Sequence, residues 1–506
     1  MVRVIRGWGG VIALLLTLFA QAVSAQTLTT WVTTTAAFGP GSLLAAVQGL
    51  QSGYAGVQEI RFALPAGSNV IWLNQPMPDI VGAQVRIDAS DMSGGVVVDG
   101  NGHGQISVAS GSTVQSLELR AITLRRGGRI DAGGCIRVRN ANTALTLNAV
   151  RVEDCHVYYQ SATPGVRGGA LFAAGALVIN DSVFSNNSIL SEAVIPVAAN
   201  DALGGAVYKE GAHAVSIERS VFQNNRVYLN NSLPSFCSSG HGGALALNMP
   251  GSGIAVTVRD TQFEGNRNSC RNPTVSQDID GTGDGGAIVY YGNGPNNVLL
   301  ENNYFHDNRG NRGGAVGFIQ SLTTNVIARN NTFFANHANA TGGGLAFVNC
   351  CTATVEHNTF HDNVSGSTGL PDQLALMVNA LPSLQHNLIN GGIPACDSSL
   401  AASQGGVAGY NLYFGGSCLI ANDSGSQHVD YMNWLQAPTL SGGYVPTLMP
   451  AYGSPAIDGG DPNGCAPFDA RYVMRPVDGD GDGIARCDIG AVESTIVDAI
   501  FRNQFE

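Results

Sequence analysis

The sequence predicts an all-β fold, a right-handed parallel β-helix solenoid, from three features that recur together along the chain. The first is a Gly-Gly pair that begins at Gly133, Gly168, Gly204, Gly242, Gly285, Gly313 and Gly342. The second is a Phe-x-x-Asn motif after each of the last six pairs, at Phe184/Asn187, Phe222/Asn225, Phe263/Asn266, Phe305/Asn308, Phe333/Asn336 and Phe360/Asn363. The third is apolar alternation between them, as in "AVSIERSVF", which is typical of strands.

Each marker has a place in a stack of coils. A Gly pair lets the backbone turn sharply, or approach a neighbouring rung where a Cβ atom would clash. Phe at a fixed position would stack on the Phe of the next rung, and Asn at a turn would bond to its equivalents as a ladder. A propeller is the alternative, but its blades usually run about 40 residues with Trp-rich signatures. The last Phe markers are only 27 or 28 residues apart and the chain has 4 Trp, which favours the β-helix.

Composition and charge exclude some partners. Only 12% of residues are charged, Gly reaches 66 residues, and the net charge is −12. An acidic surface repels nucleic acid and anionic lipid headgroups, so we expect neither as a partner.

We also expect the chain to be a monomer.

The first residues predict export. Arg3 and Arg6 precede the apolar run "VIALLLTLFA", and Val23-Ser24-Ala25 supplies small residues before a cut at Gln26. We therefore expect a secreted or outer-surface protein with no transmembrane segment after cleavage. The predicted organisation is a signal peptide (1–25), an N-terminal cap with the first rungs (26–130), regular repeats (131–370), degraded final rungs (371–435), a C-terminal region (436–494) and a tail (495–506). The cap includes a short amphipathic helix from Ser42.

Ten cysteines in an exported chain favour disulfides. Sequence neighbours suggest the pairs Cys135/Cys155, Cys237/Cys270, Cys396/Cys418 and Cys465/Cys487, with Cys350-Cys351 left as an adjacent pair. Sequence alone does not fix this connectivity.

Long insertions follow the Phe marker in three consecutive rungs, over 188–203, 226–241 and 267–284. Insertions at one register of a solenoid stack on one face, which is often the binding face. The third insertion carries Asp278, Asp280 and Asp284, the only candidates for catalytic residues.

Carbohydrate chemistry is the enzymatic alternative for these residues. A calcium-dependent lyase acting on an acidic polysaccharide such as pectin needs carboxylates that hold calcium and an Arg that removes a proton. The sequence offers Arg125, Arg126 and Arg129 for that role, several rungs away. A glycoside hydrolase needs clustered carboxylates on neighbouring rungs. The Gly-His-Gly segments at His103 and His241 lack accompanying Asp motifs, so neither enzyme is the preferred interpretation.

The best metal-binding pattern is Asp478-x-Asp480-x-Asp482-Gly483, because oxygen ligands at alternate positions converge in a tight loop. An EF-hand would place Glu at the twelfth position, where Ile489 stands beside Asp488. We therefore expect a lone structural calcium site formed by Asp478, Asp480, Asp482 and Asp488.

The C-terminal region contains Gly453-Ser454-Pro455-Ala456-Ile457-Asp458, Asp469-x-Arg471, Arg475-Pro476 and Asp488-Ile489-Gly490-Ala491-x-Glu493. Through these motifs it resembles the choice-of-anchor Q region of secreted bacterial β-helix proteins of the pectin-lyase-like fold. The start "GPGSLLAAVQGLQ" resembles the CSLREA-type segment that often precedes such helices. The resemblance implies a secreted or surface-displayed β-helix.

From these observations the sequence predicts an adhesin-like binding or structural protein outside the cell, without catalysis. Its expected partner is an extracellular polysaccharide or a ligand on a host or cell surface. The alternative is the lyase or hydrolase described above.

Overall fold

The computed structural model describes residues 26–159, 165–191, 202–230, 240–272, 277–292, 294–366, 373–377, 379–391, 396–397, 406–414, 418, 422–429 and 434–495. The predicted signal peptide, Cys237 and nearly all of the tail lie outside these residues.

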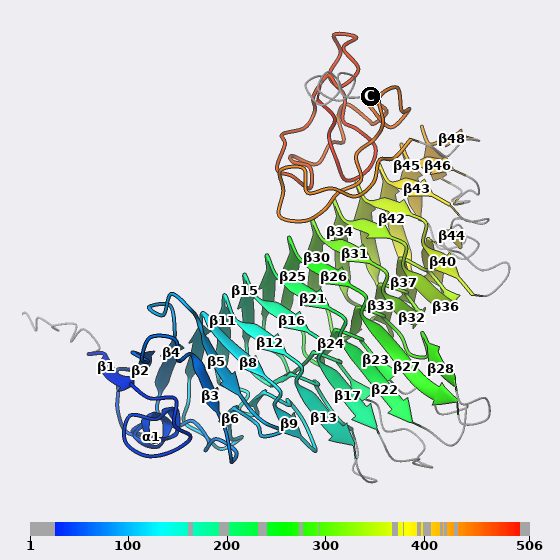
Figure 1. Cartoon of the computed structure of the whole chain (residues 1–506). Helices are drawn as coiled ribbons and strands as arrows, with labels where there is room; N and C mark the ends of the chain where they lie inside the picture. Colours follow the sequence, from blue (N-terminus) through cyan, green and yellow to red (C-terminus); the bar gives the residue numbers. More distant parts are fainter. Residues whose placement is uncertain are drawn as a thin grey trace, which may run out of the picture.

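The described strands coil into a parallel β-helix (Figure 1). They form four long sheets, here named A, B, C and D, of 14, 13, 10 and 9 strands. One coil passes through sheets C, A, B and D in turn, and each strand pairs in parallel with its equivalent in the next coil. The predicted fold class is thus confirmed.

Sheet A comprises β1 (Leu28–Val32), β2 (Val57–Phe62), β4 (Gln84–Asp88), β7 (Ser116–Arg120), β11 (Ala144–Asn148), β15 (Leu177–Asn180), β20 (Val215–Glu218), β25 (Ala255–Arg259), β30 (Asn297–Glu301), β34 (Asn325–Arg329), β38 (Thr352–Glu356), β42 (Leu381–Gln385), β45 (Val407–Gly409) and β47 (Asn422–Ser424). Sheet B comprises β3 (Val70–Trp72), β5 (Val96–Asp99), β8 (Ile122–Arg125), β12 (Arg151–Glu153), β16 (Val183–Ser185), β21 (Val221–Gln223), β26 (Gln262–Glu264), β31 (Tyr304–His306), β35 (Thr332–Phe334), β39 (Thr359–His361), β43 (Leu388–Asn390), β46 (Leu412–Phe414) and β48 (Gln427–Val429).

Sheet C comprises β6 (Ile106–Val108), β10 (Ile136–Val138), β14 (Leu171–Ala173), β19 (Val207–Glu210), β24 (Leu245–Met249), β29 (Ile288–Gly292), β33 (Val316–Ile319), β37 (Leu345–Val348), β41 (Leu374–Met377) and β44 (Cys396–Asp397). Sheet D comprises β9 (Gly128–Arg129), β13 (His156–Tyr159), β17 (Ser188–Ser191), β22 (Arg226–Asn230), β27 (Arg267–Asn272), β28 (Gln277–Asp280), β32 (Arg309–Arg312), β36 (His337–Thr341) and β40 (Val364–Ser365). A separate pair is formed by β18 (Ala202–Leu203) and β23 (Gly240–His241).

The helix expected at the N-terminal end is α1 (Leu43–Gln48). Ser42 is its N-cap, and the Ser42 hydroxyl accepts a hydrogen bond from Ala45 N at 3.2 Å. This bond satisfies one of the amide groups that a helix start leaves unpaired. Leu43, Leu44 and Val47 are buried in the main apolar cluster at the first rungs.

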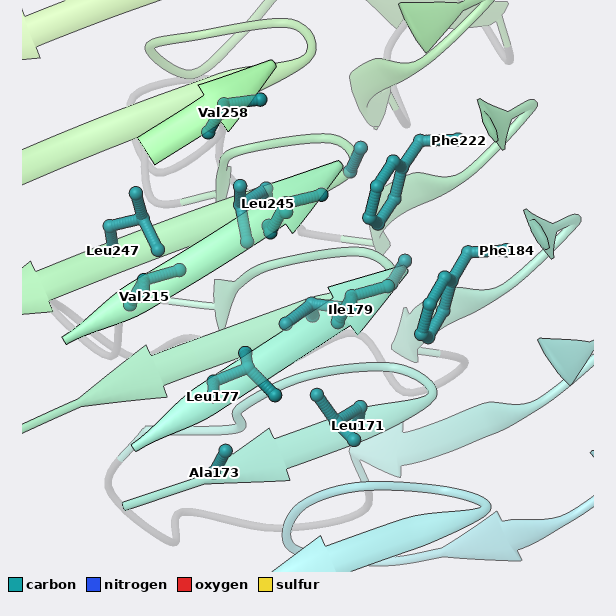
Figure 2. Packing of buried hydrophobic residues seen from close by; sticks show 14 of the residues in the cluster. Leu171, Ala173, Leu177, Ile179, Phe184, Val215, Phe222, Leu245, Leu247 and Val258 are labelled. Carbon is teal, nitrogen blue, oxygen red and sulfur yellow. The ribbon is translucent and has the colours of Figure 1, made fainter. Parts of the chain in front are cut away.

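The core is a continuous apolar column inside the coils (Figure 2). The Phe markers lie on sheet B and point inward, and Phe222 stacks on Phe184 and on Phe263 with ring centroids 5.0 Å apart. The stack continues to Phe305, Phe333 and Phe360. The Phe stack predicted from the repeat is therefore present.

Both predicted roles of the Gly pair occur, one at each of its positions. The first residue adopts a left-handed conformation, with φ +64° at Gly242, which Gly enters without a Cβ clash. The second residue lies against the next rung, where a Cβ atom on Gly243 would stand 2.1 Å from the Gly286 carbonyl oxygen. Any other residue at Gly243 would push the rungs apart.

Buried amides form two ladders at the corners of sheet B. After β21, the Asn225 side chain donates to Asn266 Oδ1 at 3.0 Å, and the Asn266 side chain donates to Asn308 Oδ1 at 3.0 Å. Before sheet B, a second ladder runs through Asn303, Asn331, Asn358, Asn387 and Asn411. The first ladder was predicted from the Phe-x-x-Asn motif. The second was not predicted, although Asn two residues before each of the last three Phe markers was its sequence signal.

The three predicted insertions begin as strands rather than as loops. Ser188, Arg226 and Arg267 open β17, β22 and β27, which stack in register on sheet D. In the third segment β28 folds back antiparallel to β27, with Cys270 opposite Ile279. The three segments thus share one side of the coil, as expected.

Disulfides join Cys135 to Cys155, Cys396 to Cys418 and Cys465 to Cys487, as the sequence neighbours suggested. Cys350 and Cys351 are bonded to each other in a buried turn between sheets C and A. Cys270 is also disulfide-bonded. Within the part of the chain that the structure describes, no helix has the length and apolar character needed to cross a bilayer.

The C-terminal region packs against the outside of the coil, on the turns that join sheets A and B (orange to red in Figure 1). From the turn after β7 to the turn before β46, each of these turns has one non-Gly residue in the left-handed conformation, including Asp260, Asn302, Asn330, His357 and His386. We call these five residues the turn column. Asn and Asp tolerate this conformation better than most residues, and His is also enriched there.

Candidate functional site

The three acidic residues of the third segment lie near one another in the chain but have separate structural roles. Asp284 is buried and accepts two hydrogen bonds from the Arg312 guanidinium, at 2.7 Å and 2.6 Å. Asp280 accepts from the Ser269 hydroxyl at 2.8 Å, and Asp278 accepts from the Tyr228 hydroxyl at 3.0 Å. Asp278 and Asp280 share one face of β28, whereas Asp284 lies beyond it at the corner leading to sheet C.

The arginines considered for a lyase do not approach these carboxylates through any contact that the structure shows. Arg125 and Arg126 both form ion pairs with the buried Asp99 at 2.8 Å. Arg129 is held by the Ile106 and Gly133 carbonyl oxygens. Instead, Asp280 lies 3.4 Å from Arg267 and 3.9 Å from Arg309, both on sheet D.

The predicted acidic loop is a tight turn organised by its own carboxylates. Asp478 accepts from the backbone amides of Gly481 at 2.7 Å and Gly483 at 2.9 Å. Asp458, which precedes this loop in the sequence, accepts from the amides of Gly479 and Asp480, each at 2.9 Å.

Two carboxylates of this loop, together with Asp458, could hold a metal ion. Asp458, Asp478 and Asp480 each offer an oxygen atom within 4.8 Å of the others. Burial raises the pKa of Asp458, and the nearby Asp480 charge acts in the same direction, so a cation there would relieve both effects. The sequence identified Asp478 and Asp480 but not Asp458, because nothing in local spacing links position 458 to the loop.

The other two predicted ligands lie elsewhere. Asp482 is exposed, and its carboxylate accepts from the amide of Ile484 at 2.7 Å. Asp488 is buried, and its two oxygens accept from the amides of Asp458 at 2.8 Å and Ser494 at 2.6 Å. The structure therefore groups Asp478 and Asp480 with Asp458 and leaves Asp482 and Asp488 out of that group.

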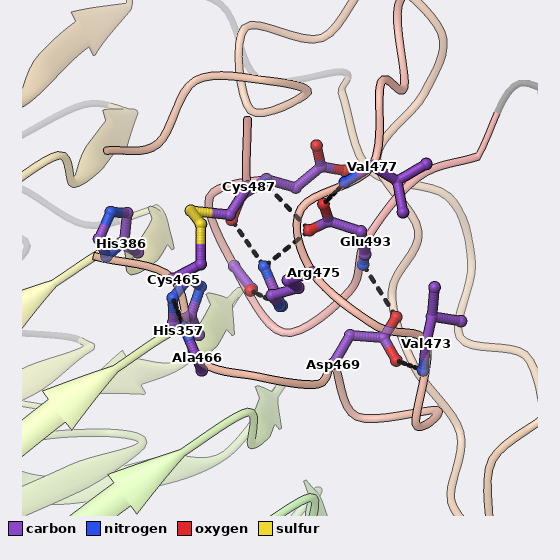
Figure 3. A network of polar contacts seen from close by, with 12 residues as sticks. His357, His386, Cys465, Ala466, Asp469, Val473, Arg475, Val477, Cys487 and Glu493 are labelled. Carbon is purple, nitrogen blue, oxygen red and sulfur yellow. Dashed lines mark hydrogen bonds and ion pairs between the residues drawn. A yellow bond between two sulfur atoms is a disulfide. The ribbon is translucent and has the colours of Figure 1, made fainter. Parts of the chain in front are cut away.

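A buried ion network lies at the centre of the C-terminal region (Figure 3). Arg475 donates to Glu493 Oε2 at 3.0 Å and to the carbonyl oxygens of Asp488 and Gly490. Glu493 also accepts from the amides of Val477 and Asp488. Since buried charges are stable only when paired and hydrogen-bonded, these contacts fix the fold of a region without long strands.

The network has more acidic than basic groups. Among the described residues, three carboxylates (Asp469, Asp488 and Glu493) meet two guanidinium groups (Arg471 and Arg475), so the negative charges are in excess. Burial raises the pKa of Glu493 to about 8 and the pKa of Asp488 to about 6, although Arg475 lowers both. The raised pKa of Glu493 means that a proton on this carboxyl group can offset the excess negative charge near neutral pH.

The C-terminal region is attached to the turn column by direct hydrogen bonds. The Asn330 side chain donates to the Phe468 carbonyl oxygen at 2.9 Å, and the Tyr472 hydroxyl donates to Asp260. The amides of Ala466 and Asp461 donate to Nε2 of His357 and His386, at 3.2 Å and 2.9 Å.

The two histidines of the turn column stack with ring centroids 4.5 Å apart. Burial, with the charge of Arg475, lowers the pKa of His386 to about 4 and lowers the pKa of His357 well below its usual value. Both rings are therefore neutral near pH 7, which leaves Nε2 free to accept the backbone amides.

Comparison with known proteins gives no relative: no protein-family model matches the chain, and no curated protein matches it.

Proposed function

We propose that this chain is an exported binding or structural protein, adhesin-like, that presents the outside of a β-helix to an extracellular or cell-surface ligand and does not act as an enzyme. One observation carries the proposal. Asp278, Asp280 and Asp284 each engage a different polar partner, and Asp284 is buried in a bidentate ion pair. A lyase needs carboxylates grouped to hold calcium, and a hydrolase needs carboxylates clustered around one glycosidic bond; Asp284, buried in its own ion pair, is suited to neither role.

Support for the extracellular location comes from the first 25 residues, which have the pattern of a signal peptide, and from the disulfides. We further propose that residues 436–494 form a region of the choice-of-anchor Q type. The motif residues behind that resemblance include Asp458, Asp469, Arg475 and Glu493, which all belong to the hydrogen-bonded interior of this region.

A specific observation favours the alternative, a polysaccharide lyase. Asp280 lies between Arg267 and Arg309, which resembles the pairing of a carboxylate with an arginine that such a reaction needs. The purified mature chain should be incubated with polygalacturonate and other acidic polymers, with and without calcium, while absorbance from new unsaturated ends is followed. We expect no product. Calcium-dependent product that disappears in Asp280→Asn would overturn the non-catalytic proposal and establish the lyase.

We also propose that the acidic loop binds calcium in a structural role, through Asp458, Asp478 and Asp480. A ligand that binds only the folded state stabilises it by about 2.7 kcal/mol at a hundredfold excess over Kd. Calcium should therefore raise the melting temperature of the purified chain, and Asp480→Asn should abolish most of that rise. The measurement is a thermal melt with calcium, with magnesium or with chelator, supported by calorimetric titration of calcium.

Asp482→Asn is the matched control. Asp482 lies two residues after Asp480 and does not belong to the group of three, so the substitution removes the same charge from the loop without removing a proposed ligand. It should leave the calcium effect unchanged. An equal loss in Asp480→Asn and Asp482→Asn would show that general loop charge, rather than the group of three, determines calcium binding.

A further inference from the structure

Two neighbouring cavities lie along the seam between sheet A and the C-terminal region. One has a volume of about 200 Å³ and is lined by residues that include Asn330, Phe468 and Glu301. The other has a volume of about 290 Å³ and is lined by residues that include Tyr444 and Glu218. Arg259 and Tyr472 line both. Pockets that enclose a drug-sized ligand measure roughly 300–1,000 Å³, so each cavity alone is below that range, and a ligand that used both would lie across Arg259 and Tyr472.

The sheet A wall of the seam is a row of alternating charges. Glu218, Arg259, Glu301, Arg329 and Glu356 occupy the same register position on successive strands. Arg259 lies 2.8 Å from Glu301, and Arg329 contacts Glu301 and lies 3.3 Å from Glu356. Opposite charges on directly paired residues stabilise a sheet, so the two guanidinium groups offset two of the three carboxylates and the row keeps a small negative excess.

The alternation of Glu and Arg along this wall determines which class of ligand can bind to it without electrostatic repulsion. A polyanion would meet a carboxylate on every second strand, and a polycation would meet a guanidinium, so each would suffer repulsion along the row. A neutral polyhydroxylated ligand has no such conflict, because each hydroxyl group can donate to Glu and accept from Arg.

The opposite wall supplies aromatic rings. Tyr444, Phe468 and Tyr472 are 54%, 46% and 46% exposed, although large apolar side chains are usually buried. Tyr444 and Tyr472 meet edge to face with ring centroids 6.2 Å apart. The carbon-bound hydrogens of a sugar ring form an apolar face that packs on such rings, while its hydroxyl groups point to the edges.

We propose that this seam binds a neutral oligosaccharide, with sugar rings against Tyr444 and Phe468 and hydroxyl groups on the charge row. The inference rests on the proposed binding function and specifies its ligand class and location. It differs from the sequence-based expectation, which placed binding on the segments of sheet D and considered an acidic polymer.

The test begins with the mature chain on an array of neutral and uronic acid-containing oligosaccharides. The neutral probe that binds best is then titrated against variants by calorimetry. Tyr444→Ala and Phe468→Ala should each weaken binding at least tenfold, because each removes a stacking surface. Tyr444→Phe should bind like the unaltered chain. Binding should change little between low and high salt, since no ligand charge is involved.

Tyr452→Ala is the matched control, because Tyr452 is 62% exposed in the same region and lines neither cavity. It should leave affinity unchanged, and a thermal melt should show that every variant is folded. Neutral-glycan binding that survives Tyr444→Ala and Phe468→Ala would overturn the location and leave the binding function standing. Binding of acidic probes alone would overturn the ligand class. Binding of no probe would overturn the inference entirely, whereas release of cleaved product would overturn the non-catalytic function instead.

Discussion

Asn308→Leu should lower the free energy of unfolding by about 4 kcal/mol. The Asn308 side chain accepts from Asn266 N and Nδ2, and donates to the Phe263 carbonyl oxygen and to Asn336 Oδ1. A Leu side chain is close in volume but leaves several of these buried groups unpaired. Each such group costs about 1–3 kcal/mol. The measurement is urea unfolding followed by circular dichroism.

Asn325→Leu is the control for this change, because Asn325 occupies an exposed position on β34. Its side chain makes one weak contact, 3.4 Å from Asn297 Oδ1, so the substitution should cost no more than about 0.5 kcal/mol. Equal, small effects of Asn308→Leu and Asn325→Leu would mean that backbone pairing alone holds the rungs and that the ladder adds little.

Phe263→Ala should destabilise the chain by about 3–5 kcal/mol, the usual range for emptying a buried Phe site. Phe263 is fully buried between Phe222 and Phe305, each with its ring centroid 5.0 Å away. Since those two rings are fixed by their own strands, the cavity should not collapse. Unfolding in urea measures the loss, and Phe263→Leu should recover part of it by filling some of the space.

Phe38→Ala is the corresponding surface control, because Phe38 is 67% exposed. It should be nearly neutral. If Phe263→Ala were equally mild, the interior of the coil would be free to repack around the missing ring.

The sequence is most informative at positions where the same residue type recurs from coil to coil and contacts its equivalents in the neighbouring coils. Gly243, Phe263 and Asn266 each contact the same residue type on a neighbouring rung, so their period in the sequence is also their contact pattern in space. The fold, the Phe stack and the first ladder could be predicted for this reason.

The strands of sheet D could not be predicted from the sequence, because their lengths and the lengths of the segments that follow them vary from coil to coil. The segments that begin at Ser188, Arg226 and Arg267 differ in sequence. The sequence alone therefore predicts an insertion over the whole of each segment, although each begins with a strand. Pairing with the neighbouring rung, rather than local sequence, determines that they form strands.

The candidate sites were hardest to predict, because they join residues far apart in the chain. Asp458 reaches the loop at Asp478 across a region that has no repeat. Tyr444 and Tyr472 meet Arg259 only because the C-terminal region packs back on the coil. No sequence spacing relates these positions. The alternating charges on sheet A, by contrast, follow from the sequence as soon as the pairing register of the strands is known.

The attachment of the C-terminal region to the turn column has a consequence for the order of assembly. Its contacts extend from Asp260 to His386, and every residue of the column precedes it in the chain. It can therefore dock only after those rungs have stacked with correct spacing. A coil shifted by one residue would move Asn330 or His357 away from its partner. The C-terminal region, which is synthesised after these coils, can therefore make all of its contacts only with a correctly wound helix.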